Sequence, residues 1–122
     1  MPLTQPLVLS GVLANIDALE KSLDWQPFRP GIDIARLYND GDAGSSSAFL
    51  RYTPGATVAY HSHPGYEHIL ILKGSQTDRL GEHGPGSLII NPPGTAHSVT
   101  SPNGCIVLIL WEKPVVLRPQ PA

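Results

Sequence analysis

Short apolar runs, separated by turns rich in glycine and proline, follow one another along most of this 122-residue chain. An alternation of apolar and polar positions, or a bounded apolar run of four to eight residues, predicts a β-strand. The runs predict strands at 7–9, 32–38, 48–52, 57–63, 67–72, 75–78, 87–90, 97–99 and 105–111, and we expect the strand at 87–90 to be buried. About nine short strands with regular turns predict an all-β fold, either a small antiparallel barrel or a double-sheet jelly roll.

One stretch has helical rather than strand periodicity. Between Ser10 and Trp25 the apolar residues recur every three or four positions, with charged residues between them. This predicts a short N-terminal helix, and Asn15 is an alternative N-cap that would shorten it to about 16–23. We expect its apolar stripe to pack on the protein's own outer surface, although a dimer contact is the alternative.

The remaining segments carry turn signals. Two prolines and a glycine in 25–31 predict irregular structure, and the glycines of 81–86 predict a hairpin loop with a solvated His83. We expect 114–122 to be a trailing arm whose Val115–Leu117 run pairs with the edge of a neighbouring molecule. The length predicts a single domain over 1–122, with its core at about 32–112 and a helix and arm at 1–31.

The composition of the chain argues against several classes of protein. The net charge is −2 and the eight Lys and Arg residues are scattered, so we expect no nucleic-acid binding. No apolar stretch reaches 18 residues, and no cationic segment precedes Leu7, so we expect neither a membrane span nor a signal peptide. Cys105 is the single cysteine, so no internal disulfide can form, which is typical of a protein of the reducing cytosol.

Four residues are candidate metal ligands. His61 and His63 are two positions apart, so an extended strand directs both imidazoles to one face. Glu67 follows a Pro-Gly turn, and His97 follows a second turn at 91–96. Three imidazoles and one carboxylate suit one divalent transition metal, namely iron, zinc, manganese, nickel or copper, better than calcium.

The spacing of these residues resembles the two-part motif of the cupin superfamily. It runs Gly55-x5-His61-x-His63-x3-Glu67-x6-Gly74, and then Gly86-x5-Pro92-x-Gly94-x2-His97. The resemblance implies a small cupin double-stranded β-helix, a jelly-roll barrel, with the four residues as ligands of one metal. The family often has Asn four residues after the last His, where this chain has Ser101, and Asn103 could take its structural place.

Within the cupins, the chain is most similar to the ChrR-like group, whose namesake is a zinc-binding anti-sigma factor. The likeness covers about 25–110. It rests on three stretches: Trp25-x-Pro27 with Pro30-Gly31-Ile32, Leu50-Arg51-Tyr52-x-Pro54-Gly55-Ala56, and Asn91-Pro92-Pro93-Gly94 through Ser101-Pro102-x-Gly104-Cys105. After Glu67 this group commonly has a second Glu, where this chain has His68, which we expect to point out of the barrel. The anti-sigma activity does not carry over, because it belongs to a separate helical zinc domain with Cys and His ligands, and 1–24 contains neither residue.

The ChrR-like group also resembles dioxygenases that cleave small ketones and diketones. Two functions therefore stay open: an Fe(II)-type dioxygenase acting on a small ketone or diketone, or a non-catalytic cupin that senses a metal or a small-molecule ligand. No catalytic residue is assigned, since Tyr38, Tyr52, Tyr60 and Arg51 are candidates by residue type alone. The apolar runs near both ends predict a homodimer.

Overall fold

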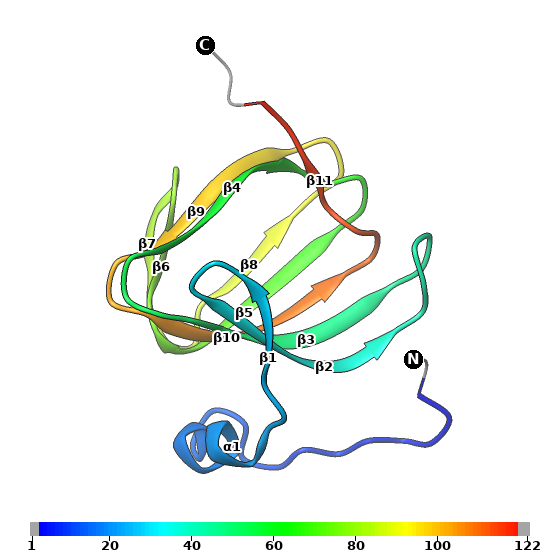
Figure 1. Cartoon of the computed structure of the whole chain (residues 1–122), viewed down its shortest axis with the longest axis vertical. Coiled ribbons are helices and arrows are strands. Elements are labelled where there is room, and N and C mark those ends of the chain that lie inside the picture. Colours follow the sequence, from blue (N-terminus) through cyan, green and yellow to red (C-terminus); the bar gives the residue numbers. More distant parts are fainter. Residues whose placement is uncertain (1–2, 120–122) are drawn as a thin grey trace.

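The computed structural model describes residues 3–119 and consists mostly of strands in two antiparallel sheets that face each other (Figure 1). The six-stranded sheet has the order β1 (Gln26–Arg29), β2 (Ile32–Asn39), β3 (Ser46–Tyr52), β10 (Cys105–Trp111), β5 (Glu67–Gly74) and β8 (Leu88–Asn91). The five-stranded sheet has the order β11 (Val116–Leu117), β4 (Ala56–Ser62), β9 (Ala96–Ser101), β6 (Gln76–Asp78) and β7 (Gly81–His83). This confirms the all-β jelly roll, although the two sheets do not close into one hydrogen-bonded barrel.

The core lies between the sheets, and β10 is its most apolar contributor. Cys105, Val107, Ile109 and Trp111 belong to the inner cluster, while Ile106 and Leu108 belong to a second cluster. Strand β10 lies between β3 and β5 and is covered on both sides, so it carries apolar residues at every position. Burial raises the pKa of the Cys105 thiol to about 11, so this cysteine stays an uncharged core residue.

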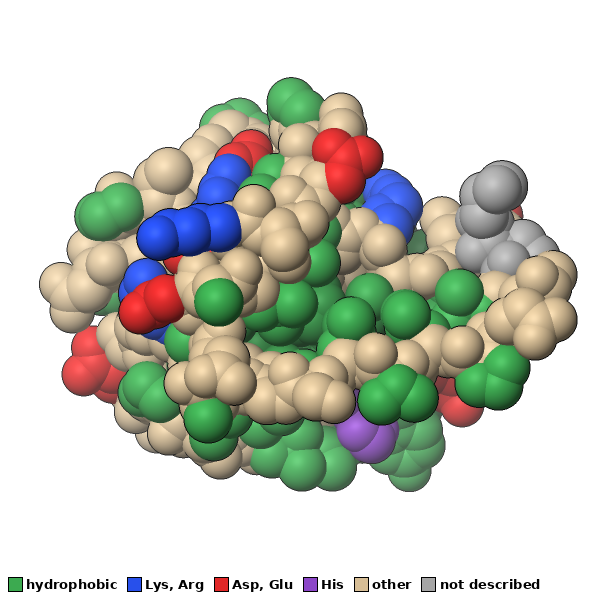
Figure 2. Space-filling model, turned by 90° about the horizontal axis from the view of Figure 1, so that it is seen from below, with side chains coloured by type: hydrophobic (Ala, Val, Ile, Leu, Met, Phe, Trp, Pro, Cys, Tyr) green, Lys and Arg blue, Asp and Glu red, His purple; other side chains and the backbone are tan. Residues whose placement is uncertain are grey.

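The second cluster packs helix α1 (Ile16–Ser22) and the N-terminal arm against the outer face of the six-stranded sheet. Figure 2 looks at this side and shows hydrophobic side chains gathered across the middle of the face. Arg51 on β3 reaches Glu20 of the helix at 3.3 Å and Asp33 of β2 at 2.9 Å. The apolar stripe of the helix therefore packs on its own molecule, as expected. The helix begins at Ile16, as in the shorter of the two predicted ranges. No helix among residues 3–119 is long and apolar enough to span a membrane.

Three secondary-structure predictions were wrong. Residues 26–29 form the edge strand β1 despite Pro27, because an edge position does not require every backbone N–H. Residues 7–9 form no strand and instead lie along the outer sheet face. Strand β8 is not buried as predicted: only Ile89 points into the core, whereas Leu88 and Ile90 are 59% and 47% exposed.

Two predictions about the turns and the C-terminal segment also need correction. His83 is not solvated in a loop, because it lies in β7 and its Nε2 is 2.9 Å from Oδ1 of Asp78, whose side chain is 4% exposed. The run at 115–117 does not reach a neighbour within the structure, because β11 pairs with β4 of the same chain, at Ser62 and His61. The predicted arm at 114–122 is described only as far as 119.

Candidate metal centre

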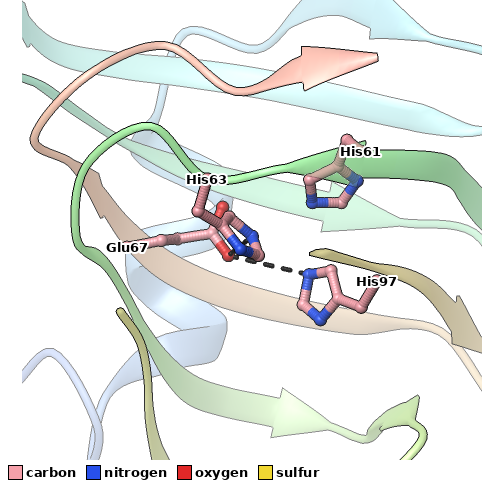
Figure 3. A group of neighbouring side chains, drawn as sticks. All are labelled: His61, His63, Glu67 and His97. Atoms are coloured by element: carbon pink, nitrogen blue, oxygen red, sulfur yellow. Dashed lines mark ion pairs between the residues drawn. The ribbon is translucent and has the colours of Figure 1, made fainter. Parts of the chain in front are cut away.

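The structure brings the four predicted ligands together between the two sheets (Figure 3). His61 on β4 and His97 on β9 are cross-strand partners, so their side chains share the inner face. Glu67 opens β5 in the opposite sheet. One ligand atom from each of the four residues lies within 4.8 Å of the others, so the cluster could hold a metal ion.

His63 lies just beyond the end of β4, and the second turn block holds it in place. Its backbone N–H donates to the Thr95 carbonyl at 2.9 Å, and its own carbonyl accepts from the Gly94 N–H at 2.9 Å. Gly94 has φ +88°, a left-handed conformation that favours glycine. The Pro-Pro-Gly turn thus positions His63 as well as His97, although His63 lies 31 residues before Gly94 in the chain.

Hydrogen bonds fix which ring nitrogen of two histidines faces the cluster. His61 Nδ1 lies 2.9 Å from the Ala59 carbonyl, which can only accept, so Nδ1 carries the proton and Nε2 keeps its lone pair. The Thr95 hydroxyl donates to the Pro92 carbonyl at 2.7 Å and therefore accepts from His63 Nδ1 at 2.9 Å. The Nε2 atoms of His61 and His63 are therefore free to bind a metal. In metal sites, hydrogen bonds of this kind to the other ring nitrogen orient the imidazole ligands.

The carboxylate of Glu67 is held by its two cross-strand neighbours. Trp111 Nε1 donates to Oε2 at 3.0 Å and Asn91 Nδ2 donates to Oε1 at 3.0 Å. The register places Trp111 and Asn91 directly opposite Glu67, one on each side. The sequence did not reveal Thr95, Asn91 or Trp111 as supporting residues, because only strand register shows which side chains are opposite.

The pKa values of His61, His97 and Glu67 are all shifted toward the forms that bind metal. All four ligand residues are buried, with exposed fractions of 2% to 8%. Burial lowers the pKa of His61, and burial together with the nearby His61 lowers the pKa of His97 to about 4. Burial alone would raise the pKa of Glu67, but the contact with His63 and the three imidazoles outweigh it and lower that pKa. Neutral imidazoles and a carboxylate are the forms that bind metal.

Two buried nitrogens of the cluster have no hydrogen-bond partner. These are Nε2 of His63 and Nε2 of His97, which lie 3.2 Å and 3.8 Å from Oε1 of Glu67 without hydrogen-bond geometry (dashed lines in Figure 3). A buried polar atom without a partner is costly. A divalent cation between these electron-rich atoms would satisfy all of them, so the residues present fit a metal ion.

A cavity opens beside the cluster, with His61, Glu67 and His97 in its wall. Its solvent-accessible volume is about 40 Å³, room for roughly three water molecules. The rest of the wall is mostly apolar: Phe28, Ile32, Leu50, Val58, Ile69, Val99, Ile109, Trp111 and Val115, with Arg29, Tyr52 and Gln76 as the other polar residues. The arrangement therefore offers a small, largely apolar chamber next to the candidate metal position.

Other residues singled out in the sequence lie outside the cluster. His68 is not among the grouped ligand side chains, as expected, and Arg51 pairs with carboxylates on the outer face. Ser101 is fully buried and its hydroxyl donates to the Ser75 carbonyl at 2.6 Å, while Asn103 is exposed. Ser101 thus links the end of β9 to the segment between β5 and β6, and Asn103 does not take that role.

Replacing Thr95 by valine tests the support of His63. Valine keeps the shape of threonine but removes the acceptor of the His63 Nδ1–H bond. We expect metal affinity to fall by roughly 10–100-fold, the usual effect of losing an outer-shell partner. Competition with a chelator measures it, and Thr100→Val on β9 is the matched control that should leave affinity unchanged. Equal affinity of the two variants would contradict this role of Thr95.

Comparison with known proteins shows to which family the chain belongs. A model of the ChrR cupin-like domain matches residues 14–115. Among curated proteins, a Cereibacter sphaeroides protein named as a dimethylsulfoniopropionate lyase is 31% identical over 67 residues. That match covers 52% of this chain but 29% of the lyase, so the chain spans less than a third of that relative.

Solved structures share the fold at low sequence identity. The anti-sigma factor ChrR from Rhodobacter sphaeroides, in complex with SigE, matches with a TM-score of 0.68 and 23% identity, covering 88% of this chain and 70% of the matched one. An acetylacetone dioxygenase from Acinetobacter johnsonii matches with a TM-score of 0.71 and 17% identity, covering 94% and 78%. At these identities the likeness concerns the fold alone.

Proposed function

Because this chain belongs to the family of ChrR cupin-like domains, we propose that it is a metal-dependent oxygenase acting on a small ketone or diketone. His61, His63, Glu67 and His97 would bind one divalent transition metal, with iron(II) as the ion for this activity. The observation that carries the proposal is the cluster of oriented, unpartnered ligand atoms in the wall of an apolar cavity.

When bound, such a metal supplies Lewis-acid and redox chemistry at open coordination positions. The chain's own residues would fix the geometry around it. Thr95, Asn91 and Trp111 hold the rings and the carboxylate in one orientation. The apolar wall excludes bulk water from the reacting atoms, and the small cavity favours small substrates.

Metal analysis followed by oxygen uptake tests the proposal. Protein reconstituted with iron(II) without air should contain one iron per chain and consume oxygen in step with the loss of acetylacetone or a related small ketone. Glu67→Gln, which removes the carboxylate charge, should abolish uptake and weaken iron binding. Full iron occupancy without oxygen uptake over a series of small ketones and diketones would overturn the oxygenase assignment.

One observation favours a second function, a metal-dependent sensor or binding module. The cavity is small, so four protein ligands could enclose a zinc ion and leave no position for a substrate. Tight binding of zinc in preference to iron, with no exchangeable water on a bound cobalt(II) probe, would support this alternative and contradict the oxygenase. The fold likeness to ChrR, itself an anti-sigma factor, is compatible with such a role.

The predicted homodimer remains a proposal, and we propose the edge of the six-stranded sheet at β8 as its interface. Strand β8 ends the six-stranded sheet and exposes Leu88 and Ile90. Two antiparallel copies of one edge strand form a two-fold symmetric pair, so a second copy is a self-complementary partner. We expect light scattering at tens of micromolar to give twice the 13.1 kDa of the chain.

A single charged substitution tests this dimer interface. Leu88→Lys should halve the mass, whereas Leu80→Lys, at a 75% exposed turn position, should leave it unchanged. A parent protein of about 13 kDa under these conditions would refute the dimer.

A further inference from the structure

Arg29 is a cation without an acidic partner in the wall of the cavity. Arg51 and Lys73, by comparison, do have acidic partners: Arg51 reaches two carboxylates, and Lys73 reaches Asp17 at 2.7 Å. Arg29 forms no ion pair in the described part of the chain; its guanidinium lies over the ring of Phe28, 4.9 Å from the centroid. The residue is half-buried, so its charge is partly removed from water, and no carboxylate among residues 3–119 pairs with it.

A β-bulge directs Arg29 to this position. The pairing of β1 with β2 shifts register between Pro27 and Arg29, so Phe28 is an extra residue in the edge strand. Bulges re-aim side chains next to functional sites. As a result, Phe28 and Arg29, which are neighbours in the chain, both line the cavity, and β1 lies at the edge of its sheet (Figure 1).

Two polar groups of the cavity wall, Arg29 and Tyr52, can donate hydrogen bonds to an oxyanion. Gln76 Nε2 donates to the Tyr52 hydroxyl over 3.4 Å, so the hydroxyl proton remains available to the cavity. Burial raises the pKa of Tyr52 far above its ordinary value, so the hydroxyl keeps its proton and can donate it in a hydrogen bond. Arg29 and Tyr52 are thus two donors on a wall that is otherwise mostly apolar.

We infer that Arg29 selects a small organic anion, a carboxylate or an enolate on a short apolar chain, as the ligand of this cavity. The inference rests on the proposed function, because it concerns the same cavity beside the candidate metal position. Apolar walls accept the hydrocarbon part of the ligand, and the guanidinium forms charge-assisted hydrogen bonds with the oxyanion. The small size of the cavity favours a ligand with a short chain.

Titration with matched probes tests the inference, with butyrate as the carboxylate, butyramide as its neutral counterpart and acetylacetone as the enolate source. The protein is loaded with zinc, which is redox-inert, and the metal content of each variant is measured first. We expect the parent to bind butyrate, acetylacetone enolate or both at least about tenfold more tightly than butyramide. Arg29→Gln should remove that preference and leave butyramide binding unchanged, whereas Arg29→Lys should retain part of it.

Arg36→Gln is the matched control. Arg36 also lies near the Phe28 ring, 5.9 Å from its centroid, but it is exposed and does not line the cavity. Loss of butyrate binding alone, or of enolate binding alone, on Arg29→Gln identifies which anion the site takes. Unchanged anion binding in Arg29→Gln, or an equal loss in Arg36→Gln, would overturn the inference.

The experiment distinguishes a failure of the proposed metal site from a failure of the role inferred for Arg29. A parent protein without bound zinc would contradict the metal site. The titrations would then be made on metal-free protein, where the comparison of Arg29→Gln with the parent decides the role of Arg29 in the same way.

Discussion

His97→Ala is expected to lose its metal, because it removes one of four ligand side chains from a buried cluster. Loss of an outer-shell partner typically weakens metal affinity by roughly 10–100-fold, so loss of a direct ligand should weaken it at least as much. Since metal binding stabilises the folded state alone, a 100-fold loss of affinity removes about 2.7 kcal/mol of stability in excess metal. For a chain of this size that is a fall in melting temperature of roughly 10 °C.

His83→Ala is the control for this experiment, because it also removes an imidazole close to turn residues. Its metal content should equal that of the parent. Its stability should fall by about 1 kcal/mol, because the buried Asp78 carboxylate loses one hydrogen-bond partner and keeps the Leu80 N–H. Metal stoichiometry and melting curves, with and without metal, separate the two effects. If His83→Ala loses the metal and His97→Ala keeps it, the assignment of the ligands is wrong.

Gly74→Ala is expected to be among the most destabilising single substitutions in the protein. Gly74 has φ +73°, and a Cβ at this position would overlap the backbone carbonyl oxygen of Gly104 and lie 2.9 Å from Cα of Cys105. Both obstacles are backbone atoms, one in the residue before β10 and one in its first residue, so neither can rotate away. A left-handed alanine costs about 1–2 kcal/mol and overpacking about 1–3 kcal/mol more. We expect a loss of about 3 kcal/mol in the free energy of unfolding in urea.

Gly55→Ala separates the two contributions to that loss. Gly55 has a similar φ of +85°, but no atom lies within 4 Å of where its Cβ would be. This variant should therefore carry only the conformational cost of about 1 kcal/mol. Equal losses in the two variants would show that the contact with Gly104 yields, contrary to the geometry.

The local pattern of the chain was enough to predict much of the fold and the members of the site. Period-two alternation and turn residues predicted most of the strands, because side chains of a strand alternate between faces and glycine and proline interrupt it. The spacing of His61, His63, Glu67 and His97 marked the four residues that the structure brings together. Spacing suffices here because the strands and turns that carry the ligands are themselves readable in the sequence.

Only the tertiary structure decided what depends on register and on contacts between distant segments. Trp111 and Asn91 support Glu67 because the sheet places them opposite it, and a shift of one residue would direct them to the other face. Strand β8 was predicted to be buried because apolar runs in central and edge strands look alike. Gly74 and Gly55 are both motif glycines, yet only Gly74 lies against another backbone segment, a contact made by residues 30 positions away in the chain.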